Sequence, residues 1–258
     1  MIEWAATTSP ALDLTADATV GLLPVGATEQ HGPHLPLGTD TIVATALCHA
    51  AAERVTGTTA VVLPAIPIGV SYGHGIRLPG TLSLTPELLA ATVRQIVEWS
   101  AASELRRILI VNAHMGNSAA LSTATDHLRL FRPDLQVGQI DWWSSTPDVF
   151  AEMTSDGEDV HANRAETSMM LAVAPDMVDL SLARDADDVD RTGDLVFRYT
   201  AESLSRNGVT GRPSEATSEL GARLLAAAST EIARRLERGQ AEAPPLGPGR
   251  APLQPRNH

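Results

Sequence analysis

The sequence contains no lysine, and its charge is strongly unbalanced toward acid. All 19 basic residues are arginine, against 31 aspartate and glutamate residues, which gives a formal net charge of -12 at pH 7. A field of this sign repels phosphate backbones and anionic lipid surfaces. We therefore expect neither nucleic acid nor membrane among the partners of this protein.

Cysteine and long apolar runs are also scarce. The one cysteine, Cys48, cannot form a disulfide within the chain, and it lies in an alanine-rich stretch that predicts a helix over 39–52. A buried, unreactive thiol is the common case at such a position. Nowhere do 18 consecutive apolar residues occur, and residues 1–17 carry no basic cluster ahead of an apolar run. These absences predict a soluble, cytoplasmic protein.

The sequence does contain a regular alternation of apolar runs and helical patterns. Its 258 residues, 43% of them hydrophobic, can bury one large core. A threonine N-cap at Thr85, followed by Pro86, indicates the start of a helix. The patterns predict strands at 20–25, 60–66, 108–111 and 135–140, with helices between them at 39–55, 86–103 and 118–131. This order predicts an α/β fold, a mainly parallel sheet with helices on both faces.

The pattern loosens after residue 140. Helices are expected around 166–174 and 216–238, with an acidic loop through 184–194 between them. Residues 239–258 are rich in proline, glycine and alanine, which favours a flexible tail. We therefore expect a single domain over 1–238, followed by this tail.

Acidic and histidine side chains follow the first predicted strand. Glu29 and His31 are two residues apart, so in an extended segment they point to the same side, and Asp40 begins the next helix. A carboxylate and an imidazole that converge at a strand end suit a divalent ion such as zinc or manganese. In parallel sheets, ligands bind at the carboxyl ends of the strands, where these residues fall.

Other loops contribute further candidates. His114 lies in the turn after the third strand, and His161 and Glu166 come from the polar region beyond the fourth. A single loop histidine is more often structural than functional, but acids and imidazoles clustered at neighbouring strand ends indicate a metal or catalytic site. The histidines in helices and at the terminus are interpreted as surface or packing residues: His49, His127 and His258.

The segment 26–40, Gly-Ala-Thr-Glu-Gln-His-Gly-Pro-His-Leu-Pro-Leu-Gly-Thr-Asp, resembles the signature loop of the creatininase (creatinine amidohydrolase) family. More segments follow in the order of that family, and the resemblance spans residues 20–236. These segments are 69–74 leading into 79–83, then 112–117, 161–168, and 208–213 with 216–217.

The resemblance implies a three-layer α/β/α sandwich with two divalent ions (zinc, manganese or iron) and homo-oligomers, often hexamers. Carried across by position, Glu29 and His114 hold one ion, His31 and a second carboxylate hold the other, and Asp40 bridges both. A bridging carboxylate suits a pair of ions about 3.5–4 Å apart.

Two positions depart from the creatininase pattern. Gly116 stands where creatininases carry a glutamate that binds metal. Glu166 is the expected substitute ligand. The alternative is that Glu166 only interacts with the dipole at a helix N-terminus. Gly157 stands where creatininases carry a tryptophan, which argues against creatinine itself as the substrate.

The implied chemistry is hydrolysis of an amide-type C–N bond in a small molecule by a metal-activated water. Glu166 and His161 are the catalytic candidates; His161 would supply a proton at a pKa near neutrality, or instead cap the helix region of Glu166. His34 is expected to support a ligand from behind. The expected substrate contacts are His74, Ser71, Tyr72, Arg77, Trp142 and Trp143. For the two tryptophans, packing or a subunit contact is the alternative role.

Three other functions stay open at this point. Some members of the family trim a short precursor peptide during maturation of a redox cofactor, and another branch opens cyclic ketones by C–C hydrolysis. A non-catalytic binding protein is the third alternative, because a fold alone does not establish activity. The complete ligand set favours an enzyme.

Overall fold

The structure, a computed structural model, describes residues 1–75 and 77–245. Its centre is a five-stranded sheet with the strand order β1-β3-β2-β4-β5, in which every pairing is parallel. The strands are β1 (Ile2–Glu3), β2 (Thr19–Val25), β3 (Thr59–Val62), β4 (Arg107–Asn112) and β5 (Gln136–Asp141). The predicted α/β fold with a parallel sheet is confirmed.

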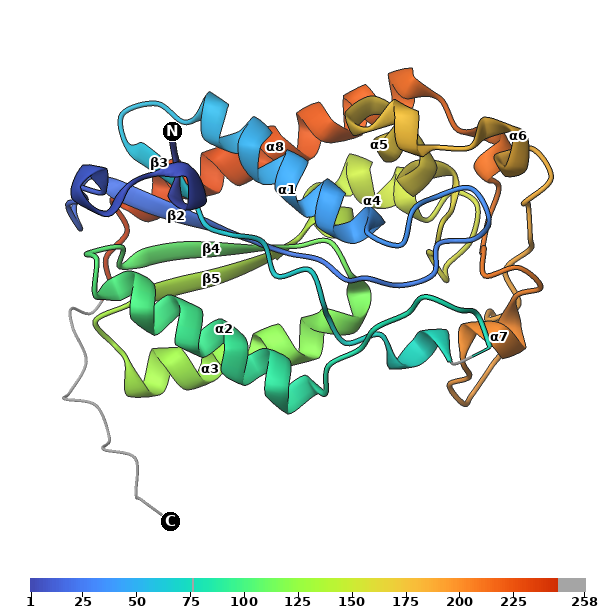
Figure 1. Ribbon diagram of the computed structural model, residues 1–258, viewed down its shortest axis with the longest axis horizontal. Helices are drawn as coiled ribbons and strands as arrows, with labels where there is room; N and C mark the ends of the chain where they lie inside the picture. Colours follow the sequence, from blue (N-terminus) through green and yellow to red (C-terminus); the bar gives the residue numbers. More distant parts are fainter. Residues whose placement is uncertain (76, 246–258) are drawn as a thin grey trace, which may run out of the picture.

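Helices cover both faces of this sheet. Figure 1 shows α1, α5 and α8 on one face and α2 and α3 on the other, which makes three layers. The helices are α1 (Thr39–Arg54), α2 (Pro86–Ala101), α3 (Ser118–Phe131), α4 (Pro147–Met153), α5 (Arg164–Val173), α6 (Leu180–Ala183), α7 (Ala201–Leu204) and α8 (Ser218–Gln240). Within the described residues, none of these helices has the length and apolar character needed to cross a membrane.

The central strand β2 divides the core into two parts. All seven of its residues are buried, and successive side chains point to opposite faces of the sheet. Leu22 joins the cluster under α1 and α8, whereas Leu23 joins the cluster over α2 and α3. Burying one such leucine contributes about 2 kcal/mol. The continuous apolar run of β2 is therefore explained by helices that cover both of its faces.

The predicted element ends needed several corrections. The strand expected over 60–66 ends at Val62, because Pro64 cannot donate to a ladder. The last helix extends to Gln240, two residues into the expected tail, and residues 246–258 of that tail lie outside the described part. The short helix α4 was not predicted, although Thr146 and Pro147 give it the same start signal that marks α2.

Packing between α5 and α8 depends on one glycine, and this generates a stability prediction. A Cβ atom at Gly221 would overlap the backbone carbonyl of Ser168 in α5, so Gly221→Ala must push the helices apart. We expect a loss of about 1–3 kcal/mol in the free energy of unfolding, measured by urea denaturation. Gly239→Ala, in the same helix but with open space at its Cβ, is the matched control and should change stability by less than about 1 kcal/mol. Equal effects of the two variants would contradict this account.

Candidate metal centre

The two central strands β2 and β4 end side by side at one edge of the sheet. Val25 pairs with Asn112 in the last register position, and the chain then turns toward α1 after β2 and toward α3 after β4. Ligand sites of parallel sheets form where neighbouring connections diverge in this way. Glu29 and His114 come from these two loops and therefore meet at the same edge.

The buried side chain of Asn117 ties three loops together at this edge. Its Nδ2 donates to the carbonyl of Gly26 at 2.9 Å, and its Oδ1 accepts from the Val70 N–H at 2.8 Å. The loops that follow β2, β3 and β4 are thereby held in contact. Because Val70 in turn binds His114, Asn117 indirectly sets the position of that imidazole.

Backbone carbonyls fix which ring nitrogen faces the centre in two histidines. His31 Nδ1 lies 3.2 Å from the Glu29 carbonyl, and His114 Nε2 lies 2.9 Å from the Val70 carbonyl. A carbonyl oxygen only accepts, so each of these nitrogens carries the ring hydrogen. The opposite nitrogens, His31 Nε2 and His114 Nδ1, then present lone pairs to the centre when the rings are neutral, as metal-binding histidines do.

Those lone pairs face carboxylates. His31 Nε2 lies 3.2 Å from Asp40 Oδ1, and His114 Nδ1 lies 3.4 Å from Asp40 Oδ2. His114 Nδ1 also lies 3.1 Å from Glu29 Oε1. Lone pairs and carboxylates repel one another unless a cation, either a proton or a metal ion, lies between them. Each oxygen of Asp40 therefore faces a different histidine, which is the arrangement of a bridging ligand.

Several buried polar atoms at this point lack hydrogen-bond partners among the described residues. They are Glu29 Oε2, His31 Nε2 and Asp40 Oδ2. A buried polar atom left without a partner costs about 1–3 kcal/mol, and more when it is charged. Divalent ions bound here would satisfy these three atoms, so the donor set fits a metal centre.

Glu166 reaches the same centre from the start of α5. Asn163 caps this helix by accepting from the Glu166 N–H at 3.0 Å, while Glu166 Oε2 accepts from the Ala162 N–H at 2.6 Å. Ala162 adopts a φ of 50°, a left-handed conformation that is rare for alanine and costs about 1 kcal/mol. Ligand atoms of His31, Asp40 and Glu166 all lie within 4.8 Å of one another. Glu166 therefore both faces the centre and binds backbone at the helix start.

The pKa values reflect the same crowding of charge. Burial lowers the pKa of His31, but the carboxylates of Asp40 and Glu166 outweigh it and raise the value to about 10. Burial is likewise overcome at His114, where Glu29 raises the pKa to about 9. Burial, helped by the charge of Asp40, raises the pKa of Glu166 to about 7. His31, His114 and Glu166 retain their protons because positive charge, or the loss of a negative one, stabilises the buried cluster of carboxylates.

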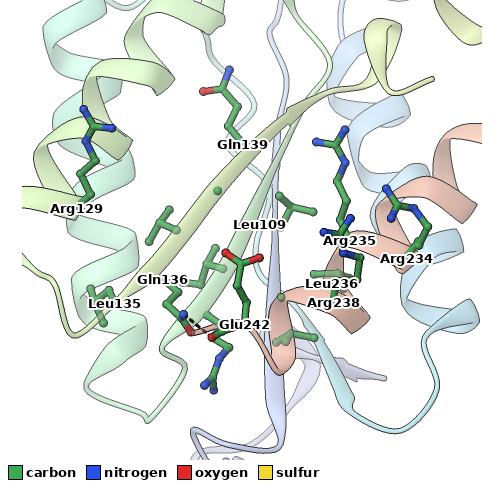
Figure 2. Close-up of a pocket in the computed structure, with 16 residues that line it drawn as sticks. Leu109, Arg129, Leu135, Gln136, Gln139, Arg234, Arg235, Leu236, Arg238 and Glu242 are labelled. Carbon is green, nitrogen blue, oxygen red and sulfur yellow. Dashed lines mark hydrogen bonds between the residues drawn. The ribbon is translucent and has the colours of Figure 1, made fainter. Parts of the chain in front are cut away.

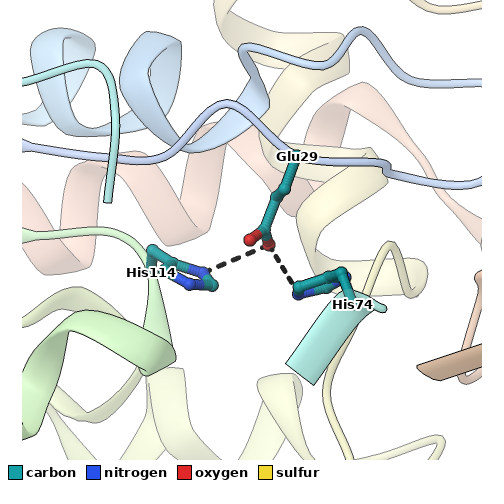
Figure 3. A group of neighbouring side chains, drawn as sticks. All are labelled: Glu29, His74 and His114. Atoms are coloured by element: carbon teal, nitrogen blue, oxygen red, sulfur yellow. Dashed lines mark ion pairs between the residues drawn. The ribbon is translucent and has the colours of Figure 1, made fainter. Parts of the chain in front are cut away.

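His74 contacts Glu29 in a different way. Gln30 Oε1 accepts from the Gly32 N–H at 3.1 Å, so the Gln30 amide nitrogen is the atom that lies 3.0 Å from His74 Nδ1, and it donates. His74 Nε2 must then carry the hydrogen and donate to Glu29 Oε1 at 3.0 Å. Figure 3 shows this contact of Glu29 beside its contact with His114. His74 therefore orients Glu29 and has no lone pair to offer there.

His161 lies at the rim of the centre. Its Nε2 lies 2.7 Å from the Gln30 carbonyl, which only accepts, and 2.9 Å from the Gln30 amide nitrogen, whose two hydrogens have acceptors in His74 and the Gly208 carbonyl. Nε2 therefore carries the ring hydrogen and donates to the carbonyl, while Nδ1 lies 3.9 Å from Glu29 Oε1. Burial and the neighbouring imidazoles of His74 and His31 hold the pKa of His161 well below its usual value. The lowered pKa runs against the expectation of a value near neutrality. A neutral His161 presents its Nδ1 lone pair on the side of Glu29, where His161 groups with Glu29 and His31 as a candidate metal ligand.

A cavity of about 190 Å³ opens onto these side chains. Some of the expected substrate contacts line this cavity and others do not. Ser71, His74 and Trp143 line it, and the Ser71 hydroxyl is buried without a partner among the described residues. Trp142, in contrast, is 1% exposed and packs in the core, because consecutive residues of the turn 142–144 point in different directions.

Tyr72 and Arg77 are placed differently from the expectation of direct substrate contact, whereas support of a ligand by His34 stays a prediction. Tyr72 is 58% exposed and does not line the cavity, because the turn 72–74 directs His74 inward instead. Arg77 is exposed and binds through its backbone, donating its N–H to Glu202 at 2.7 Å. His34 Nε2 pairs with the Thr167 hydroxyl at 2.8 Å, in the residue after Glu166, and burial, helped by the neighbouring charge of His31, lowers the pKa of His34 to about 4.

Sequence reasoning missed several residues of the site. Gln30 was treated only as the spacer between Glu29 and His31, although its amide holds His74. Asp159 lines the cavity two residues before His161, and Tyr199 and Leu204 reach it from a distant segment that has no recognisable pattern. The position of Gln30 inside the signature loop was the one available signal.

Comparison with known proteins places these features in a family. The chain is 34% identical over 247 residues to the mycofactocin precursor peptide peptidase of Mycobacterium tuberculosis, covering 92% of this chain and 91% of that protein. It is 35% identical over 182 residues to the creatinine amidohydrolase of Pseudomonas putida, covering 65% and 69%. A solved mutant creatininase of Zn-Zn type superposes with a TM-score of 0.80 at 28% identity, covering 93% of this chain and 98% of that one.

The family model named creatininase and described as creatinine amidohydrolase matches residues 5–236, slightly more than the span over which the sequence resembles the family. Together with the relatives, it shows that this chain belongs to the creatininase family.

Proposed function

We propose that this protein is a metal-dependent hydrolase that cleaves an amide-type C–N bond in a small molecule. The observation that carries the proposal is a set of buried atoms on Glu29, His31 and Asp40 that have no hydrogen-bond partner within residues 1–75 and 77–245. Membership of the creatininase family and the Zn-Zn type of a solved relative support the same chemistry. Carboxylate and imidazole donors suit zinc, manganese and iron alike, so we leave the native metal to measurement.

Two ions are the number that the donor set supports. Glu29 and His114 would hold one ion, His31 and Glu166 the other, and Asp40 would contribute one oxygen to each. When bound, such a pair of divalent ions lowers the pKa of a water and polarises the substrate carbonyl. In this assignment Glu166 replaces the ligand that a glutamate at position 116 supplies in creatininases.

The protein's own groups would handle the proton. His161 is neutral, with its Nδ1 lone pair directed toward the side of Glu29, so it can take a proton from the attacking water. Its depressed pKa makes the resulting imidazolium a ready donor to the leaving nitrogen. His74 holds Glu29 in place, and the Ser71 hydroxyl, which has no partner in the part of the chain that the structure describes, is available to the substrate.

The size of the cavity favours a small substrate, since drug-sized ligands usually occupy about 300–1,000 Å³. A second candidate is the trimming of a short peptide, and the 34% identity to a precursor peptide peptidase over nearly the whole chain supports it. Met115 and Tyr199 line the cavity and are exposed, so an extended peptide could continue past them to the surface.

We further propose that the protein is a homo-oligomer, with the hexamer as the expected form. An apolar stretch at the molecular surface supports association, because monomers rarely expose contiguous large side chains. Its exposed members are Leu195, Val196, Phe197 and Tyr199. Sedimentation velocity on the full chain measures the assembly directly.

The first prediction concerns metal and activity together. We expect about two metal ions per chain in the wild type, by analogy with two-metal hydrolases, measured by elemental analysis. Asp40→Asn and Glu166→Gln should lose metal, because each removes an anionic ligand from the shared site. His161→Gln should keep its metal and lose hydrolysis by about 10²–10⁴-fold, the usual share of a general acid–base. A panel of lactams, formamides and short peptides identifies the substrate class.

His127→Gln, on the surface of α3, is the matched control for the histidine variant and should behave as wild type. Full metal content in Glu166→Gln would remove that residue from the ligands. A metal-free wild type after refilling would contradict the hydrolase proposal and favour a binding protein. Turnover of peptides alone would replace the small-molecule assignment with the second candidate.

The second prediction tests why position 116 is glycine here. A Cβ atom at Gly116 would overlap both the Val70 carbonyl oxygen and His114 Nε2, which form the bond that orients His114. Gly116→Ala should therefore weaken metal retention, measured as the chelator concentration that removes half of the metal. Gly193→Ala, where open space surrounds the Cβ, is the control. Unchanged retention in Gly116→Ala would show that the orienting bond is dispensable.

A further inference from the structure

A second and larger cavity lies at the opposite end of the sheet from the metal centre. It has a volume of about 570 Å³ and is bordered by the amino-terminal halves of β4 and β5 and by the end of α8. Gln136 and Arg107, which begin these two strands, both line it. The metal ligands lie beyond the other ends of the strands, so hydrolysis does not account for this groove.

The edge of the sheet forms the floor of the groove. Among the described residues, β5 pairs with β4 on one side and with no strand on the other. The Gln136 N–H bonds to Arg106 in the β4 direction, so by the alternation of a parallel ladder Val137 and Gln139 direct their backbone groups outward. Gly138 between them is exposed and adds no side chain to block approach. Such an edge is a template for an added strand.

Arginines flank this edge on both sides. Figure 2 shows Arg129 of α3 on one side of β5 and Arg234 and Arg235 of α8 on the other. Five arginines line the groove: Arg107, Arg129, Arg234, Arg235 and Arg238. Glu242 is the carboxylate that lines it among the described residues. Two further carboxylates pair with lining arginines from outside the groove, Asp126 with Arg129 at 3.2 Å and Asp17 with Arg107 at 3.9 Å. In a molecule of net charge -12, these guanidinium groups gather where an added strand would lie, and the exposed ion pairs that they form are weak enough for an incoming carboxylate to share the donors.

One carboxylate at the margin of the groove arranges two of these arginines. Glu231 accepts from Arg234 at 2.7 Å and from Arg235 at 2.9 Å, and these bonds hold its pKa at about 2. The two guanidinium groups are therefore positioned before any ligand arrives. Both side chains stay about half exposed, which leaves donors for an incoming carboxylate.

A second copy of this chain is a poor occupant of the edge. Pairing of β5 with β5 of another copy would bring the two sets of arginines against each other, and like charges in close contact are destabilising. An extended segment that carries carboxylates instead satisfies both features, because its backbone pairs with β5 and its side chains meet the arginines. Charge complementarity therefore selects the occupant.

We infer that the β5 edge is a docking site for an extended acidic peptide segment of a partner protein. The segment adds a strand beside β5, pairs with the outward backbone groups of Val137 and Gln139, and places its carboxylates between Arg129 on one side and Arg234 and Arg235 on the other. Binding is independent of the metal centre.

The test uses the full chain and a short fluorescein-labelled peptide that alternates glutamate with valine, followed by fluorescence anisotropy at low and at high salt. Affinity should fall at high salt, since exposed charge pairs are screened. Arg129→Gln combined with Arg238→Gln should weaken binding by about tenfold, the loss expected for two partly exposed charge pairs. Arg184→Gln, at the end of α6 and far from β5, is the charge-matched control and should bind as wild type.

Gln139→Pro provides an independent readout, because it removes an outward backbone donor without changing charge. It should weaken binding while thermal unfolding reports an intact fold. Equal binding of a peptide with glutamine in place of glutamate, or undiminished binding by the arginine variant, would overturn the proposal. So would a single-stranded oligonucleotide that binds the groove when the peptide does not. Dissociation of the wild-type oligomer by the arginine substitutions would assign the groove to a contact between copies instead.

Discussion

Three carboxylates buried within one small volume are the constraint on which the rest of the site depends. Removing a carboxylate from water costs several kcal/mol, and Glu29, Asp40 and Glu166 are all buried at the same edge of the sheet. The cost is tolerable only if positive charge is supplied in place. His31 and His114 hold protons unusually tightly when nothing else supplies that charge. A divalent ion meets the same requirement while leaving both rings neutral.

Backbone hydrogen bonds orient His31 and His114 so that a divalent ion can replace their inner protons. Each imidazole gives its outer N–H to a main-chain carbonyl, Glu29 for His31 and Val70 for His114, so the inner nitrogen is the one that faces the carboxylates. Asn117 then holds Val70 against the loop that follows β2. The geometry of the centre therefore rests on hydrogen bonds among loops, and the parallel sheet contributes by ending two adjacent strands at the same place.

The parts predictable from the sequence are those that depend on local signals. Periodicity located the central strands, and the Thr85–Pro86 signal located the start of α2, because both effects act within a few residues. The segment 26–40 suggested most of the ligands by its resemblance to a family. Orientation was less accessible: Trp142 and Trp143 are adjacent and chemically alike, yet only Trp143 lines the cavity. Tyr199 reaches the site through tertiary contacts such as that between Glu202 and Arg77, which no local pattern encodes.

The net charge of the chain does not predict the charge at an individual site. The value of -12 describes the field far from the molecule, and it supports the expectation that phosphate backbones are repelled. At physiological ionic strength, however, charges more than about 8 Å apart on the surface are largely screened from one another. A ligand at the β5 edge therefore meets mainly Arg129, Arg234 and Arg235 with their partners Asp126 and Glu231, and the more distant acidic residues affect it little. An acidic protein can in this way attract an acidic segment, provided that its few cations are gathered where the segment docks.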